Sequence, residues 1–304
     1  MIKYFLILIS VTIASFSSEH DYFLLNSYYS NSDFDENSSL VSSELNGVNI
    51  HSTYTKKKKS SISNERFARP IYKRIHSPAD ITIFKHKRVK PINYVNTVSL
   101  NKLEVSEKKK KFFHMILPAI LISKHKFKVL RNRVKRIIND PNPSSKDLAF
   151  LKKMYKKFKT EDNKELLIRM KTHPVSIVLA QAAIESAWGE SRFFKEGNNI
   201  FGMWSFNKNE PRMRARETRN GKAIYLKKYK SLSDAIDDYF VTIGRGAYDS
   251  FRKHRNITDD PLQLVQYLVN YCELKEKYTR RLRRFIIKNR LTQFDDFKLD
   301  SNYL

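Results

Sequence analysis

Cysteine is almost absent from this chain, which has 304 residues and a single thiol at Cys272. One cysteine excludes a disulfide within the chain and any metal site built from several cysteines. Because Cys272 ends the apolar stretch 268–272, we interpret it as a small buried hydrophobic residue rather than a nucleophile.

Long apolar runs are also lacking, since the longest, residues 4–14, is too short to span a bilayer as a helix. Lys3 precedes this run, and Ser15 and Ser17 supply small residues at the positions expected around a cleavage site. The pattern predicts a secretory signal peptide over residues 1–18, and hence a secreted or periplasmic protein associated with the cell envelope. An uncleaved signal that holds the protein at the membrane is the alternative.

Acidic residues are scarce, because 31 Asp and Glu face 58 Lys and Arg and leave a net charge of +27. Such a charge predicts polyanionic partners, namely nucleic acid, anionic lipid or an acidic wall polymer, or else a basic surface without a particular partner. The basic residues are spread along the chain rather than gathered on a recognised module, so we expect no nucleic-acid partner. His173 and His254 have no partners at metal-ligand spacing, so no metal or cofactor is predicted.

Hydrophobic periodicity predicts a mainly α fold with one small β-hairpin. Residues 19–106 show no sustained period and are expected to form a mostly disordered, basic spacer. Residues 107–172 read as an N-terminal helical extension, interrupted at Pro118 and broken at residues 140–143. A further, mainly helical domain is placed at 173–293 and a C-terminal tail at 294–304. Within the domain we expect helices over 174–188, 231–243, 261–271 and 276–289, and a hairpin turn at 220–221.

Glycine and tryptophan are few and concentrated in one region. Six of the seven glycines lie between Gly189 and Gly246, and the two tryptophans are Trp188 and Trp204. Glycine permits tight turns and a close approach of the backbone, and aromatic rings offer flat surfaces to sugars. We therefore expect the ligand to bind in this part of the chain.

One glutamate stands out on the apolar helix predicted over residues 174–188. Glu185 is the only carboxyl there, and burial among apolar neighbours raises the pKa of such a group toward neutrality. A carboxyl that stays protonated can donate to the leaving oxygen of a glycosidic bond. Spacing alone leaves open the alternative that Glu185 pairs with a cation such as Arg192.

Residues 181–191 read QAAIESAWGES, and residues 198–202 read NNIFG. Together they resemble the signature of the glucosaminidase domain of bacterial peptidoglycan hydrolases, glycoside hydrolase family 73. The segment 229–239 resembles the helix that follows the hairpin in this family, and the flanks 108–130, 247–255 and 278–291 resemble its Bax-like branch, so the resemblance covers about 107–293. It departs at Ala187, where the family usually has a glycine, and we expect this change to be harmless. The resemblance implies a lysozyme-like helical domain.

The resemblance also implies a set of site residues. Glu185 matches the general acid of the family, and Glu217, just before the hairpin turn, matches a second carboxylate found in several relatives. Alternatively, Glu217 is an exposed strand residue, and water or the 2-acetamido group of the substrate replaces it. The substrate-binding candidates are Tyr248, Trp204, Phe201, Asn199 and Ser191. For Asn199 a role in holding the loop, and for Tyr248 a role in packing, are the alternatives.

These observations predict a secreted endo-β-N-acetylglucosaminidase that cuts β-1,4 bonds in peptidoglycan glycan strands by general acid catalysis from Glu185. A muramidase or lytic transglycosylase on the same fold is an alternative, because these enzymes need only one glutamate. A non-catalytic peptidoglycan-binding protein is a second alternative of a different class. The sequence leaves the oligomeric state open.

Overall fold

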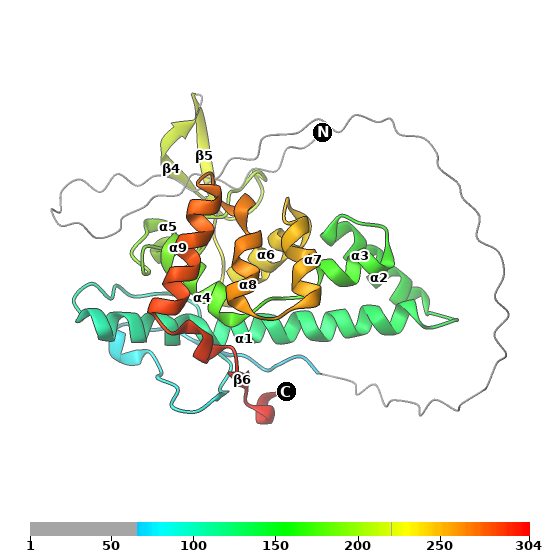
Figure 1. Ribbon diagram of the computed structural model, residues 1–304, viewed down its shortest axis with the longest axis horizontal. Coiled ribbons are helices and arrows are strands. Elements are labelled where there is room, and N and C mark those ends of the chain that lie inside the picture. Colours follow the sequence, from blue (N-terminus) through cyan, green and yellow to red (C-terminus); the bar gives the residue numbers. More distant parts are fainter. Residues whose placement is uncertain (1–65, 220) are drawn as a thin grey trace. The chain divides into compact units, whose positions relative to one another are not determined.

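A computed structural model describes residues 66–219 and 221–304. The predicted signal peptide 1–18 and the spacer up to residue 65 lie outside this part of the chain. The predicted class, mainly helical with one small antiparallel hairpin, is confirmed (Figure 1). The helices are α1 Val105–Ile138, α2 Ser145–Phe158, α3 Asn163–Arg169, α4 Val175–Glu185, α5 Arg192–Gly197, α6 Leu232–Arg245, α7 Asp249–Ile257, α8 Pro261–Leu264 and α9 Lys275–Lys288. The strands are β1 Ile71–Lys73, β2 Arg88–Val89, β3 Ile92–Tyr94, β4 Arg212–Arg219, β5 Lys222–Lys227 and β6 Lys298–Leu299.

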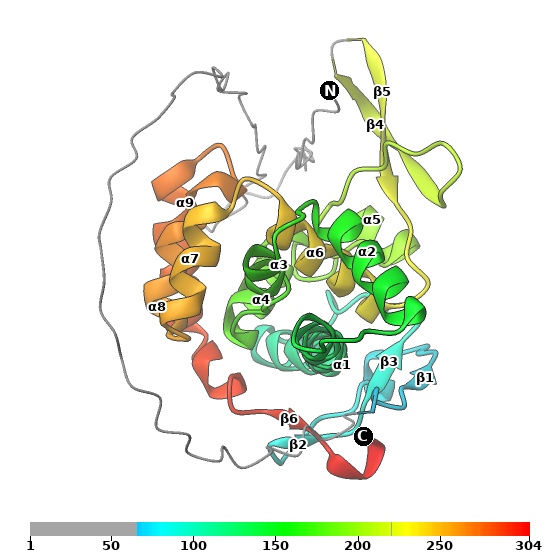
Figure 2. The ribbon, with the colours of Figure 1, turned by 90° about the vertical axis from the view of Figure 1, so that its right-hand side faces the viewer.

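The long helix α1 lies between two layers, with α4 and α6 on one side and the short paired strands on the other (Figures 1 and 2). It runs through Pro118 without a break, so the predicted interruption is wrong. A proline inside a helix costs about 3 kcal/mol because it removes a hydrogen bond and crowds the preceding turn. Here Pro118 and its neighbours from Phe112 to Ser123 are all buried, and this packing offsets the local cost.

Side-chain caps define the starts of several helices. The Ser144 side chain accepts a hydrogen bond from the Asp147 amide at the start of α2, and Ser231 does the same for Asp234 at the start of α6. The helix expected over 261–271 is instead the single turn α8 followed by 3-10 turns at Val265–Tyr267 and Val269–Tyr271. Apolar spacing cannot distinguish these tighter turns from a regular helix.

Helix α4 is the buried centre of the fold, and it packs on α1 and α9. Every residue of α4 except Ile184 is buried. A helix that is apolar all round belongs in a core, so its sequence and its position agree.

The hairpin β4–β5 is antiparallel and extends away from the helices (Figure 2). Gly221 at its turn has a φ of 71°, the left-handed conformation that glycine adopts without strain. A small separate cluster of Phe193, Met213, Ala215, Ile224 and Leu226, with Trp204 against it, holds the base of the hairpin to α5.

Residues 66–106, which we expected to be part of a disordered spacer, are folded onto the helices. Strand β1 pairs in parallel with β3, and β2 pairs in parallel with β6 at the other end of the chain. Val89, Tyr94 and Leu100 are fully buried in the main core. The expected tail 294–304 is also packed, since Phe294 and Leu299 are buried. Strands of two or three residues with distant partners leave no periodic signal, which explains both errors.

In the part of the chain that the structure describes, no helix is long and apolar enough to pass through a bilayer.

Candidate functional site

Glu185 is the last residue of α4, and the chain turns sharply after it. The Ser186 hydroxyl donates to the Ala182 carbonyl (2.6 Å) and accepts from the Gly189 amide (2.9 Å). Ala187, Trp188 and Gly189 all have positive φ, at 51°, 58° and 89°. The predicted helix 174–188 therefore ends three residues early, and a left-handed turn begins at Ala187.

The carboxyl of Glu185 is 8% exposed and lies among buried groups. Burial raises its pKa to about 8, although a hydrogen bond from Tyr278 and the positive charge of Arg281 act in the opposite direction. The Tyr278 hydroxyl donates to Glu185 Oε1 at 3.3 Å. The second oxygen, Oε2, is buried and makes no hydrogen bond to any residue that the structure describes. Glu185 is therefore protonated at neutral pH, as expected of a general acid.

Two buried side chains support this arrangement. Gln181, one helical turn before Glu185, donates from Nε2 to the Tyr278 hydroxyl at 2.9 Å, and its Oε1 accepts from Tyr239 at 2.5 Å. Tyr278 comes from α9 and Tyr239 from α6, so three helices meet at the carboxyl. Neither Tyr278 nor Gln181 was among the predicted site residues. The position of Gln181 on the same face as Glu185 was the available signal, whereas the approach of Tyr278 depends on tertiary packing.

The alternative pairing of Glu185 with Arg192 is contradicted. Arg192 lies in α5, where it pairs with Glu196 at 3.5 Å and donates to the Arg214 carbonyl at 2.7 Å. Glu190, five residues after Glu185, accepts hydrogen bonds from the Ser99 hydroxyl and the Leu100 amide, and so anchors residues 99–100.

Glu217 is exposed near the end of β4, close to the hairpin turn. The register of the hairpin shifts between Arg214 and Thr218, so Glu217 lies in the irregular part of the strand. The structure thus places Glu217 on the element expected for it, on a hairpin that extends from the helices, while its role in catalysis stays a prediction.

Two of the predicted substrate-binding residues make internal hydrogen bonds. Asn199 is buried, donates to the Met203 and Lys227 carbonyls (both 2.9 Å) and accepts from the Met203 amide (2.8 Å). This geometry favours the alternative that Asn199 holds the loop. Ser191 accepts from the Phe194 amide at 3.2 Å and caps α5.

The aromatic candidates separate into buried and partly exposed rings. Phe201 is fully buried and stacks on Tyr239 with ring centroids 4.3 Å apart. Tyr248 is 1% exposed and lies 6.2 Å from the Tyr271 ring, which in turn stacks on Tyr278 at 5.4 Å. Tyr248 therefore belongs to a row of tyrosine rings that leads to Glu185, which favours the alternative that Tyr248 has a packing role. Contact with a sugar would require this row to open.

Trp204 is the substrate-binding candidate with a partly exposed ring. It forms a bridge to Leu226 of the hairpin, and its ring lies 5.9 Å from that of Phe206, which is 58% exposed. These neighbouring rings at the base of the hairpin form the most accessible aromatic surface among the candidates.

Other titratable groups do not form a reactive site. Burial raises the pKa of the Cys272 thiol to about 12, so this residue is a poor nucleophile, as the sequence predicted. The residues that the structure describes include no group of three His, Cys, Asp or Glu side chains able to hold a metal ion.

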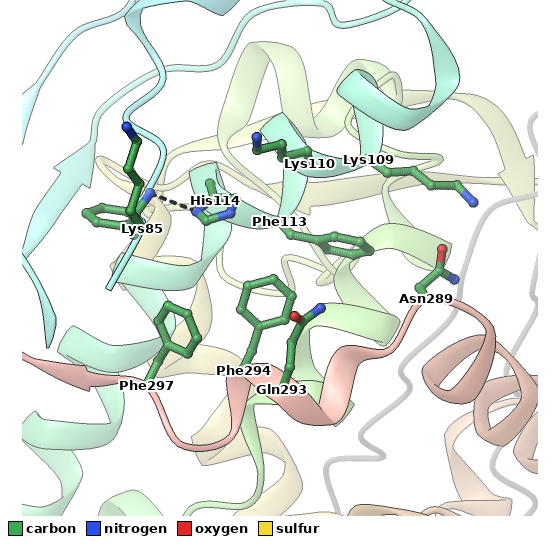
Figure 3. Close-up of a pocket in the computed structure, with 10 residues that line it drawn as sticks. Lys85, Lys109, Lys110, Phe113, His114, Asn289, Gln293, Phe294 and Phe297 are labelled. Atoms are coloured by element: carbon green, nitrogen blue, oxygen red, sulfur yellow. Dashed lines mark hydrogen bonds between the residues drawn. The ribbon is translucent and has the colours of Figure 1, made fainter. Parts of the chain in front are cut away.

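A separate cavity of about 410 Å³ lies between α1, the 84–85 segment and the chain after α9 (Figure 3). Its charged lining groups are Lys85, Lys109 and Lys110, and aromatic side chains including Phe113 and Phe294 form its floor. None of these lysines forms an ion pair with a carboxylate of residues 66–219 or 221–304. The cavity is therefore suited to anionic groups.

The segment 160–291 matches the family model Glucosaminidase, described as mannosyl-glycoprotein endo-beta-N-acetylglucosaminidase. "Protein bax" of Escherichia coli (strain K12) is 35% identical over 92 residues, which make up 30% of this chain and 31% of that protein. The chain thus matches about a third of the length of this relative. Both findings confirm the predicted resemblance, and the matched segment contains α4, the hairpin and α9.

Two solved structures are similar to this chain, with low TM-scores. The catalytic domain of the autolysin Auto from Listeria monocytogenes is 22% identical, covers 54% of this chain and 96% of its own, and has a TM-score of 0.35. A peptidoglycan hydrolase from Sphingomonas sp. A1 is 24% identical, covers 46% of this chain and 88% of its own, and has a TM-score of 0.33.

Proposed function

We propose that this chain, whose residues 160–291 match the glucosaminidase family, is a glycoside hydrolase that cuts the glycan strands of peptidoglycan, with Glu185 as the general acid. The observation that carries the proposal is the buried carboxyl of Glu185, whose pKa of about 8 keeps it protonated at neutral pH. The choice of peptidoglycan rests on the signature at residues 181–202 and on the net charge of +27, which favours an anionic wall.

In the proposed reaction, Glu185 protonates the departing glycosidic oxygen from Oε2, since Oε1 already accepts a hydrogen bond from Tyr278. Glu217, water or the acetamido group of the substrate acts at the opposite face of the sugar. Because Glu185 is only 8% exposed, the sugar must displace neighbouring side chains before the glycosidic oxygen reaches the carboxyl.

Substitution of the acid tests the proposal. Glu185→Gln keeps the size of the side chain but cannot donate a proton, so we expect digestion of purified sacculi to fall at least about 100-fold. Glu196→Gln is the matched control, because Glu196 is exposed and pairs with Arg192, and it should leave digestion unchanged. Full activity in Glu185→Gln would reject this assignment and would favour a wall-binding role.

The bond that is cut is identified from the products of the same digestion. We expect a glucosamine-type sugar at the new reducing ends, as a β-N-acetylglucosaminidase produces. Muramic acid at the reducing end would identify a muramidase, and an anhydro-muramic end would identify a lytic transglycosylase. Mass spectrometry of the released muropeptides distinguishes the three outcomes.

A pH profile tests the role of the proton. The acid is active only in its protonated form, so kcat/KM should fall above a pH of about 8, the value at which Glu185 loses its proton. If kcat/KM already fell as the pH rose through values below 6, the assignment of the acid to a buried Glu185 would be contradicted.

A further inference from the structure

The hydrogen bonds around Glu185 continue beyond Tyr278 and Gln181 to a buried histidine. His173, two residues before α4, lies with its Nε2 at 2.7 Å from the Tyr239 hydroxyl, and Tyr239 donates to Gln181. A continuous chain therefore joins His173 at the start of α4 to Glu185 at its end, by way of α6 and α9. All five side chains are buried, so water does not compete for these contacts.

The chemistry of each group determines which atom donates in each hydrogen bond between His173 and Glu185. A tyrosine hydroxyl has one proton, and a glutamine amide has one accepting and one donating end. Since Gln181 donates to Tyr278, the Tyr278 proton is directed to Glu185; since Tyr239 donates to Gln181, its oxygen must accept from His173. The proton of the His173 ring is therefore on Nε2.

Only one other pattern makes all four contacts and leaves neither tyrosine hydroxyl proton without an acceptor, and it reverses every donor. With the Gln181 amide rotated by 180°, Tyr278 donates to Gln181 and Tyr239 donates to Nε2 of His173. Glu185 would then have to donate its own proton to Tyr278 from Oε1, and that proton would be held inside the protein. The tautomer of His173 and the position of the acid proton on Glu185 are therefore coupled.

The observed donors follow the first pattern, because Gln181 donates to Tyr278 and Tyr239 donates to Gln181. Nδ1 of His173 is buried and has no hydrogen-bond partner among the described residues, so in this pattern it carries a lone pair, while the acid proton is on the equally unpartnered Oε2 of Glu185. Burial, with the positive charges of Arg255 of α7 and Lys124 of α1, holds the pKa of the ring well below its usual value. The ring is therefore neutral. The remaining neighbours of the ring, Phe240 and Phe251, are apolar.

We propose that neutral His173 is a positioning residue for Glu185, which it keeps oriented with Oε1 accepting from Tyr278 and with the acid proton on Oε2. The significance for catalysis rests on the proposed function, while the coupling between His173 and Glu185 does not. Arg281 of α9, Tyr278, Tyr239 and Cys272 are the other titratable or charged groups near the carboxyl.

The experiment compares His173→Leu, which removes the donor, with His173→Gln, whose amide places an N–H donor near the position of Nε2. Tyr239→Phe breaks the same chain one residue later. The carboxylic carbonyl band of Glu185 is measured by infrared spectroscopy across pH, as the difference from the same variant carrying Glu185→Gln. Thermal unfolding, kcat and KM on purified sacculi are measured alongside.

We expect His173→Leu and Tyr239→Phe to raise the pKa of Glu185 by about one pH unit, because the donor from Tyr278 that favours the carboxylate is weakened. They should lower kcat about 10-fold with little change in KM, whereas His173→Gln keeps wild-type values. A purely structural role would lower the unfolding temperature without moving the carbonyl titration.

An unchanged Glu185 titration in folded Tyr239→Phe would overturn the proposal, even if His173→Leu failed to fold. Equal effects of His173→Leu and His173→Gln on the titration would also overturn it. The infrared readout needs no substrate, so it tests the chain independently of the proposed function. That function fails separately if Glu185→Gln still digests sacculi.

Discussion

At the scale of single residues, the protonated carboxyl of Glu185 links folding stability to pH. Its folded-state pKa of about 8 lies above the ordinary value of 4.5, so the folded protein keeps a proton that the unfolded chain releases between these values. Stability from this group is therefore present below pH 4.5 and is lost as the pH rises to about 8. At pH 7 the contribution of Glu185 to the free energy of unfolding is about 3 kcal/mol lower than it is below pH 4.5.

Glu185→Gln removes this dependence, because the amide is neutral at every pH. We expect the variant to be more stable than the wild type by up to about 3 kcal/mol at pH 7 and to be similar to it at pH 4.5. Urea unfolding at the two pH values measures the difference. A stability difference that is the same at both would show that Glu185 is ionised in the folded state.

Ala187 is a second residue whose conformation was not expected. The resemblance implies a glycine there, and the alanine has a φ of 51°, so the change is not harmless to the backbone. The left-handed conformation costs a residue with a Cβ about 1–2 kcal/mol, and glycine avoids this cost. Glycine is also more flexible in the unfolded chain, which offsets about 0.4–1 kcal/mol of that gain. Ala187→Gly should therefore stabilise the protein by about 0.5 kcal/mol in urea unfolding. Destabilisation would indicate that the Ala187 methyl contributes packing that outweighs the strain.

At the scale of elements, local signals were read correctly and non-local ones were missed. Ser144 and Ser231 cap their helices, and Asn220-Gly221 marks the hairpin, because each acts on residues within a few positions of itself. The same locality made Glu185 recognisable from its helix and its motif. Tyr278, which donates to Glu185, and Tyr239, which donates to Gln181, lie on separate helices, and no spacing along the chain indicates that they meet.

The segment 66–106 was the largest error, and one residue tests how much it contributes. Asn93, next to the end of β3, is buried; it donates to the Ser231 (3.1 Å) and Ser233 (2.8 Å) hydroxyls and accepts from the Ser233 amide (3.2 Å). It thus connects this segment to the start of α6. Asn93→Ala leaves buried polar groups without partners, and we expect a loss of about 2–3 kcal/mol in the free energy of unfolding.

The control for this element is Asn101→Ala. Asn101 is exposed, so its substitution should change stability by less than about 0.5 kcal/mol. If residues 66–106 were a loose spacer, the two variants would behave alike in urea unfolding.

At the scale of the whole molecule, the excess of positive charge should act through particular sites. Lys85, Lys109 and Lys110 line the cavity in Figure 3, and the pKa of Lys109 is lowered by burial and by the nearby charge of Lys288. The cavity lies mostly outside residues 160–291, so it is a feature that this chain adds to the matched segment.

Charge reversal tests this surface. Lys85→Glu with Lys110→Glu should weaken the binding of inactive Glu185→Gln protein to sacculi about 10-fold at low salt, and the effect should shrink as added salt screens the charges. The control, Lys152→Glu with Lys156→Glu, places the same change in net charge on an exposed face of α2. Equal losses in a pull-down assay would mean that only the total charge matters.

The pairing of β2 with β6 has a consequence for biosynthesis. The amides of Lys298 and Asp300 donate to the carbonyls of Lys87 and Val89, and the Arg69 amide donates to the Tyr303 carbonyl. Residues 66–89 leave the ribosome more than 200 positions ahead of these partners. The helices can therefore collapse during translation, but β2 has no strand partner until residues 298–300 have emerged.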